Sequence, residues 1–249
     1  MEKTVYIDER FRGPPRSGNG GYVTGLVARL AGGHRAVYLR APAPLDVPLR
    51  FESSSDSARL THDGKVIAEA VKSDSSALPE VPAPPSLEQA RAAGRHAACS
   101  HPTCYCCGDK VAPTEGLHVH TGQVSELPPG FVAGVWKVDA AAIGGDGCLQ
   151  AEHIWSAIDC PGSYAWLAKD GINGGLTAMM QAEVLESPRV GDECIILAWP
   201  LDQLSDRRRT SGVALFDRDG RLLARAIQLW VRPNRLSVVR TFGTTRGVD

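Results

Sequence analysis

The chain has 249 residues, of which 43% are hydrophobic, so it is long enough to bury one large core or two small ones. Its formal net charge of −1 at pH 7 gives no electrostatic reason to expect a nucleic-acid partner. No apolar run reaches the ~18 residues that a membrane-spanning helix needs, and the polar first residues do not resemble a signal peptide.

The first part of the sequence predicts one helix followed by several antiparallel strands. Residues 5–11 have the pattern of a short strand, and a Gly/Pro-rich loop follows at 13–21. The apolar residues of 22–30 have helical spacing, and Gly32 and Gly33 end this helix. Further strands are predicted at 37–39, 49–52, 58–61 and 66–71.

Residues 75–115 break this pattern and predict a connection with some structure of its own, because unstructured loops of this length are uncommon. The connection is Pro-rich at 78–85, and its Ala/Arg/Glu-rich stretch at 86–96 predicts a short helix. A Cys-rich series of turns follows at 99–108. This connection separates two sets of regular elements.

The Cys-rich turns contain Cys104-x2-Cys107-Gly108, which is half of a zinc knuckle. A closed structural zinc site needs four ligands, and a second clear pair is missing from the sequence. We therefore expect free thiols and no metal, with a structural zinc ion as the alternative. Seven cysteines, an odd number, in a chain without an export signal also predict a reducing compartment, so the expected location is the cytoplasm.

The second part of the sequence repeats the order of the first. Residues 131–138 alternate as a strand, and a Gly-rich loop is predicted at 143–147. Residues 151–169 are helical in content, but Pro161 should kink or split the helix. Further strands are predicted at 178–185, 193–200, 210–216 and 222–231.

Two stretches, 62–71 and 218–227, match each other in residue type. Each has Asp-Gly before an alternating apolar run, which is a strong hairpin signal. A unit of roughly a hundred residues is too long for a solenoid repeat, which runs ~20–50 residues. The sequence therefore predicts two copies of one small domain, at 1–77 and 116–249, joined by a linker at 78–115.

A strand, a long central helix and an antiparallel sheet that can wrap it form an arrangement that resembles the hotdog-fold acyl-CoA thioesterase superfamily, in its fused double-hotdog form. Asn19-Gly20-Gly21-Tyr22 resembles the family's His-Gly-Gly helix start, with Asn in place of His. Residues 157–162, Ala-Ile-Asp-Cys-Pro-Gly, resemble the later part of the same helix, where single-domain members carry a catalytic Asp. The resemblance implies the α+β class and a double hotdog, in which two joined antiparallel sheets each wrap a central helix.

The two halves of the chain keep opposite parts of this motif. Asp159 lies in the second half, and the matching position in the first half is Ala28. The Gly-Gly pair lies in the first half, and its counterpart in the second half is Gln150-Ala151-Glu152. In the paired fold, a site takes the helix start of one unit and the acid of the other. The resemblance therefore implies one complete site and one chemically empty mirror position.

The resemblance assigns catalysis to Asp159, Asn19, Gly20 and Gly21. Backbone N–H groups at a helix start can donate hydrogen bonds to a developing oxyanion, and glycines let the backbone approach a substrate carbonyl closely. Asp159 would activate water as a general base or attack as a nucleophile, and Asn19 would orient the water or the thioester oxygen. A plain helix cap at Asp159 is the structural alternative.

Four residues are assigned to substrate binding, namely Tyr22, His153, Arg208 and Arg209. The two arginines would meet the phosphates of coenzyme A, with an exposed charged turn as the alternative. The expected ligand is a small-molecule acyl thioester, with coenzyme A as part of the substrate and no further cofactor. No nucleic-acid or membrane partner is expected, whereas a homodimer of double hotdogs is.

The function predicted from these residues is hydrolysis of an acyl-CoA or acyl-carrier thioester at one asymmetric site between the two hotdogs. A non-catalytic acyl-CoA-binding protein and an enoyl or hydroxyacyl thioester hydratase–dehydratase are the alternatives, because one fold supports several functions. The helix motif of the hydratases is not found here. No motif encodes the acyl group, because pocket depth depends on side chains spread over both sheets.

Overall fold

The first half of the chain forms antiparallel strands and one long helix. The structure, a computed structural model, describes residues 1–233 apart from 96, 98, 140–141 and 144–148. The strands of this half are β1 (Glu2–Val5), β2 (Arg35–Leu39), β3 (Leu49–Ser53), β4 (Ser57–His62) and β5 (Lys65–Lys72). The helix is α1 (Gly20–Ala31), at the predicted place. The predicted strand over 5–11 is wrong beyond Val5, because Asp8 caps a short 3-10 helix, η1 (Glu9–Phe11).

The second half follows the predicted order. Its long helical stretch is divided into α3 (Ala151–Ala157) and α4 (Cys160–Asp170). Pro161 lies in the first turn of α4, where its missing N–H costs no helical hydrogen bond, so the predicted split is confirmed. The strands are β6 (Gly122–Gln123), β7 (Val132–Lys137), β8 (Leu176–Val184), β9 (Glu193–Gln203), β10 (Arg208–Phe216) and β11 (Leu222–Val231). Most of the loop predicted at 143–147 lies outside the described residues.

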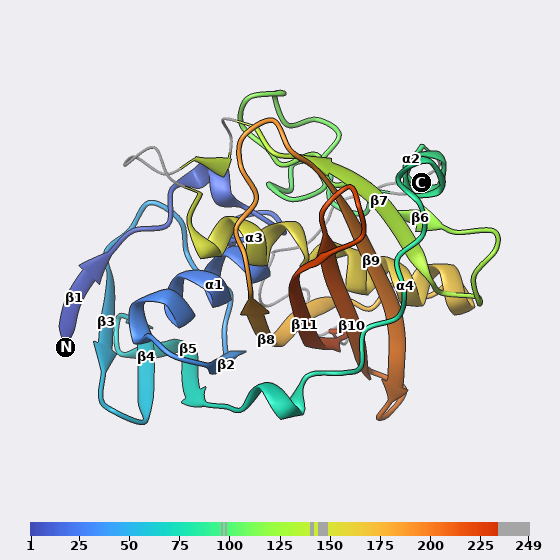
Figure 1. The fold of residues 1–249 in the computed structure, drawn as a ribbon. Coiled ribbons are helices and arrows are strands. Elements are labelled where there is room, and N and C mark those ends of the chain that lie inside the picture. The colour runs from blue at the N-terminus through green and yellow to red at the C-terminus, as the bar shows by residue number, and fades with distance from the viewer. Residues whose placement is uncertain (96, 98, 140–141, 144–148, 234–249) are drawn as a thin grey trace, which may run out of the picture.

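One antiparallel sheet carries the strands of both halves and curves around the helices (Figure 1). Its order is β1–β3–β4–β5–β2–β8–β11–β10–β9–β7–β6. The first five positions and the next five therefore run in mirrored order, and the halves meet where Val37 of β2 pairs with Met180 of β8. The two Asp-Gly turns lie at equivalent places, between β4 and β5 and between β10 and β11, as the repeat predicted.

The linker covers the outer face of the second half. It contains a short 3-10 helix, η2 (Ser75–Ala77), and α2 (Leu87–Gly94), which begins with a capping box between Ser86 and Gln89. Figure 1 shows α2 beside the β7 and β9 edge of the sheet, outside the curve that holds the other helices. Strand β9 is therefore buried on both faces: Ile196 packs into the main core and Ile195 packs with Ala90 of α2. Burial of both faces explains why β9 reads as an almost unbroken apolar run.

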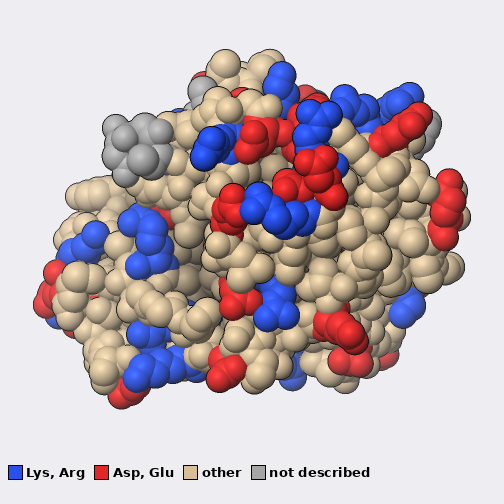
Figure 2. Space-filling model, viewed as in Figure 1, with Lys and Arg blue, Asp and Glu red and all other residues tan. Residues whose placement is uncertain are grey.

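Within the described residues, no helix has the length and apolarity needed to cross a membrane. On the face drawn in Figure 2, the basic and acidic side chains are intermixed, in keeping with the near-zero net charge. The groups that suggest a function lie instead in the interior, where α1 meets the junction of α3 and α4.

Candidate active site

A cavity of about 410 Å³ lies at the junction between the two halves. The start of α1 contributes Asn19 and Gly20 to its wall, the break between α3 and α4 contributes Asp159, and the start of β8 contributes Thr177. Most of the remaining lining is apolar. The structure thus brings Asn19, Gly20 and Asp159 together at one cavity, as the motif predicted, and adds Thr177, which the motif did not predict.

Asp159 is buried and held by three hydrogen-bond donors. Its Oδ2 accepts from the backbone N–H of Gly21 at 2.9 Å and from Nδ2 of Asn19 at 3.3 Å. Its Oδ1 accepts from the hydroxyl of Thr177 at 2.8 Å. Burial raises the pKa of this carboxyl to about 7, although the three hydrogen bonds favour its charged form. Its side chain makes no capping hydrogen bond to α4, so the alternative of a plain helix cap is wrong.

Asn19 is fixed in one orientation by its neighbours. Its Oδ1 accepts from the backbone N–H of Tyr22 at 2.9 Å, as the N-cap of α1, and from the hydroxyl of Ser156 at 2.8 Å. These two donors identify the oxygen side of the amide, so the Nδ2 group must face Asp159. Asn19 therefore caps α1 and donates to Asp159 with one side chain, which explains why an amide suits this position.

The glycines of α1 let two helices approach closely. A Cβ atom on Gly21 would lie 2.6 Å from the Cβ of Asp159, and one on Gly25 would lie 2.6 Å from the Cα of Glu152. The Gly21 N–H is already bonded to Asp159, so it is not free for a substrate oxyanion as the motif implied. Among the described residues, no hydrogen bond uses the N–H of Gly20, which lines the cavity. Gly20 is the better-placed donor.

The mirror position is not chemically empty, contrary to the prediction. Beside Ala28, the guanidinium of Arg29 forms two hydrogen bonds of 2.7 Å with the carboxylate of Glu152, the residue that corresponds to Gly21. Glu152 is almost completely buried, and Arg29 is partly exposed. An ion pair therefore occupies the place where a second site would lie, and it ties α1 to α3.

Tyr22 and His153 lie away from the cavity, in a buried aromatic cluster. The ring of Tyr22 stacks on Phe11 with centroids 3.9 Å apart, and the Tyr105 hydroxyl contacts Nδ1 of His153 at 2.9 Å. Burial lowers the pKa of His153 to about 4 and raises that of Tyr22. Neither residue is in the lining of the cavity. Tyr22 directly follows Gly21 and His153 directly follows Glu152, so the two residues occupy corresponding places on the two helices.

The three arginines that follow β9, at positions 207–209, have different surroundings. Arg209 is buried, pairs with Asp170 at 2.9 Å and lies over the ring of Trp166, so its charge is already engaged. Arg208 is exposed, and neither it nor Arg209 is in the cavity lining. Arg207 does line the cavity, and its Nε donates to the carbonyl of Arg232 at 2.8 Å. The Arg-rich turn therefore offers a different residue from the two that were predicted.

The Cys-rich linker also reaches the cavity. Cys104 from the linker and Cys160 from the start of α4 line it, and their sulfur atoms are 3.7 Å apart. The Nδ2 group of Asn19 lies 3.7 Å from the Cys104 sulfur. Sequence reasoning treated the cysteines as part of a connection, because nothing local to Cys104 indicates that it will lie beside Asp159.

Several solved structures share this fold over 94% of the chain. A protein provisionally named a thioesterase from Novosphingobium aromaticivorans has a TM-score of 0.63 at 15% identity, with 96% of its own chain covered. The tesB protein of Mycobacterium avium subs paratuberculosis has a TM-score of 0.60 at 16% identity, with 93% covered. A protein of unknown function with a hotdog fold from Alicyclobacillus acidocaldarius has a TM-score of 0.59 at 13% identity, with 94% covered. No family model and no curated protein matches the sequence. The structural likeness establishes that this chain has the hotdog fold.

Proposed function

We propose that this chain is a thioesterase made of two fused hotdog units, 1–77 and 116–249, with one working site per chain. The observation that carries the proposal is Asp159, a buried carboxyl on the wall of an apolar cavity at the start of α1. Two of the fold relatives are named as thioesterases or as a tesB protein, which agrees with this chemistry. The ion pair of Arg29 and Glu152 fills the mirror position and supports a single site.

In the proposed reaction, Asp159 activates the water that attacks the thioester carbon. A carboxylate has about four acceptor positions, and Asn19, Gly21 and Thr177 occupy three of them, so one remains for a water. The Gly20 N–H at the positive end of the α1 dipole would stabilise the oxyanion that forms. The alternative is that a carboxylate oxygen of Asp159 attacks the thioester carbon directly, as a nucleophile.

The cavity suits an acyl thioester in two ways. Its apolar lining would accept an acyl chain or the thiol-bearing arm of the substrate. Arg207 and Arg40 both line it, which would favour the phosphates of coenzyme A or of a carrier arm. We therefore place coenzyme A contacts at Arg207 rather than at Arg208 and Arg209.

The proposal is tested by measuring the free thiol released from a series of acyl-CoA esters of increasing chain length. The variant Asp159→Asn keeps the size of the side chain and can still accept from Gly21, so it should fold normally. We expect its kcat to fall by at least about 100-fold, the lower end for loss of a general base, with a much smaller change in substrate affinity. Hydrolysis at the wild-type rate by folded Asp159→Asn would exclude this role.

Absence of hydrolysis across the whole series, together with saturable acyl-CoA binding, would instead identify a non-catalytic binding protein. Appearance of an enoyl product from a hydroxyacyl-CoA would identify a dehydratase. These two outcomes separate the alternatives that the sequence left open.

A further inference from the structure

The fold brings together cysteines from two distant parts of the chain. The sulfur atoms of Cys104, Cys107 and Cys160 all lie within 4.8 Å of one another. Cys104 and Cys107 belong to the linker, whereas Cys160 is the first residue of α4. All three are free thiols. The sequence showed only one clear cysteine pair, which left zinc as the alternative to free thiols, but the fold adds a third sulfur to that pair.

The spacing of these sulfurs suits a single metal ion. A tetrahedral zinc ion with Zn–S bonds of ~2.3 Å holds its sulfur ligands ~3.8 Å apart. The Cys104 and Cys160 sulfurs are 3.7 Å apart. A disulfide joins two sulfurs at ~2.05 Å, so it would account for a pair but not for a convergence of three.

The turn around Cys104 is built as a knuckle. The backbone N–H of Gly108 donates to the Cys104 carbonyl at 2.8 Å, which closes the turn. A Cβ on Gly108 would lie 2.6 Å from the Cys104 carbonyl oxygen, so only glycine fits as the chain folds back.

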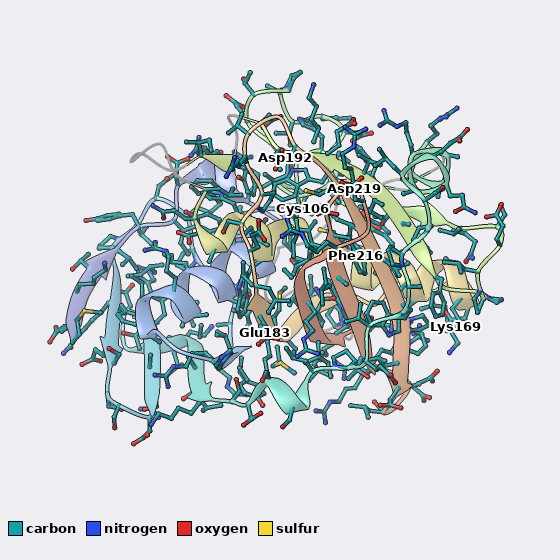
Figure 3. All side chains as sticks on the ribbon, viewed as in Figure 1. Cys106, Lys169, Glu183, Asp192, Phe216 and Asp219 are labelled. Carbon is teal, nitrogen blue, oxygen red and sulfur yellow. The ribbon has the colours of Figure 1, made fainter. Side chains whose placement is uncertain are left out.

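The start of α4 adds the third sulfur of the group. Cys160 lies in the first turn of α4, where the helix dipole stabilises negative charge. Cys106 is a further buried thiol of the same turn, and its sulfur lies 3.8 Å from the Ala157 carbonyl. Figure 3 shows Cys106 in the interior of the molecule, near the helices that the sheet encloses. The cluster is thus rich in sulfur and largely buried, with Cys160 partly exposed.

We propose that Cys104, Cys107 and Cys160 bind one Zn²⁺ ion, and that the neighbouring Cys106 thiol turns from the Ala157 carbonyl to the ion as its fourth ligand. The ion replaces the thiol protons, which are released on binding. The ion would link the Cys-rich turn to Cys160, which begins α4 and directly follows Asp159. Its role would be structural, holding the linker against the wall of the cavity.

The test measures metal in the untagged full-length chain, produced with zinc in the medium and purified under reducing conditions. We expect about one zinc per chain in the wild type and less than a fifth of that in Cys107→Ser and in Cys160→Ser. The matched control is Cys194→Ser, because Cys194 is also a buried free thiol but lies in β9, outside the cluster. It should keep its zinc. Equal zinc in all four proteins, or none in the wild type, would overturn the proposal.

A second measurement does not depend on whether the variants fold. Wild-type protein stripped with a chelator is titrated with Co²⁺, which reports thiolate ligands in a tetrahedral site by its visible and charge-transfer absorption. We expect this absorption at one equivalent, its loss when zinc is added, and a higher Tm with zinc, with a zinc Kd of about 10 nM or tighter. Failure of zinc to change either the spectrum or the Tm would exclude the site. Iron in place of zinc, with the colour of an iron–sulfur cluster, would also contradict it.

Discussion

The carboxylate of Asp159 accepts a hydrogen bond of 2.9 Å from the backbone N–H of Gly21, which lies 138 residues earlier in the chain. This contact joins the helix start of one half to the acid of the other. It requires α1 to approach the α3–α4 junction more closely than a side chain at Gly21 would permit. The catalytic geometry and the packing of the two halves therefore depend on the same glycine.

The variant Gly21→Ala should weaken both stability and hydrolysis. Its added methyl group would lie 2.6 Å from the Asp159 Cβ, so the helices must move apart. We expect the free energy of unfolding to fall by about 1–3 kcal/mol, as for other overpacked cores, and hydrolysis to fall by up to about 100-fold. Urea unfolding and thioester hydrolysis measure the two effects.

The control for this variant is Ala28→Ser in the same helix, at the position that corresponds to Asp159 in the mirror arrangement. Ala28→Ser should lower the free energy of unfolding by less than about 1 kcal/mol, the scale of a helix-propensity change, and leave hydrolysis unchanged. If Gly21→Ala were as stable and as active as Ala28→Ser, the close approach would not matter.

The ion pair of Arg29 and Glu152 should contribute to stability without affecting catalysis. In Arg29→Met, the carboxylate of Glu152 remains buried without its partner. Because the Arg29 side chain keeps 38% of its surface exposed, we expect the free energy of unfolding to fall by about 2 kcal/mol, which is below the range for fully buried pairs. The double variant Arg29→Met/Glu152→Gln should recover part of this loss, because no buried charge remains.

A double-mutant cycle by urea unfolding measures the coupling between these two residues. The kcat of Arg29→Met at 25 °C should stay within about twofold of the wild type, because ΔΔG‡ for a residue outside the working site is near zero. A large fall in kcat with unchanged stability would instead mean that the mirror position takes part in the reaction.

Sequence patterns predicted most of the fold because the signals for it are local. Alternating apolar residues and the two Asp-Gly turns are enough to place strands such as β5 and β11. Pro161 predicted the division of the second helix for an equally local reason. The strand at 5–11 was overextended because a single cap, Asp8, outweighs the apolar pattern around it.

The site was only half predictable, because much of it depends on long-range packing. Asn19 and Asp159 stand in recognisable motifs, but Thr177 reaches Asp159 from the start of β8, where it pairs with Trp230 of β11. Cys104 arrives through the path of the linker. In the sequence, Glu152 marked only the loss of the second Gly-Gly pair, and only the structure places Arg29 opposite it.

The proposed coenzyme A contact is tested by reversing one charge at a time. Arg207→Glu places a negative charge in the cavity wall, so the KM for acyl-CoA should rise at least about threefold, from the scale of partly exposed ion pairs, and the effect should shrink at high salt. The matched control is Arg208→Glu, which makes the same change at the exposed neighbour and should leave the KM within about twofold.

A substrate without the nucleotide, an acyl-pantetheine thioester, extends the comparison. Its KM should be nearly the same for Arg207→Glu and for the wild type, because the phosphates are absent. Similar increases in KM for both arginine variants with acyl-CoA would point to a general effect of charge rather than to a contact at Arg207.

The buried His153 should make the protein sensitive to acid. Its pKa is about 4 in the folded protein because burial disfavours the charged ring, whereas an unfolded histidine has a pKa of about 6.5. The folded state thus binds this proton more weakly than the unfolded chain. The stability that this difference in pKa gives the folded state is fully present above pH ~6.5 and is lost as the pH falls towards ~4. From pH 7.5 to pH 5 the loss should be about 2 kcal/mol.

The variant His153→Gln removes this titration and isolates it from all the other groups. At pH 7.5 it should be about 1–3 kcal/mol less stable than the wild type, because the packing against Tyr22 and Phe11 is lost. Between pH 7.5 and pH 5, however, its free energy of unfolding in urea should fall by about 2 kcal/mol less than that of the wild type. A parallel fall in both proteins would show that His153 is not the acid-sensitive group, whatever the cost of the substitution itself.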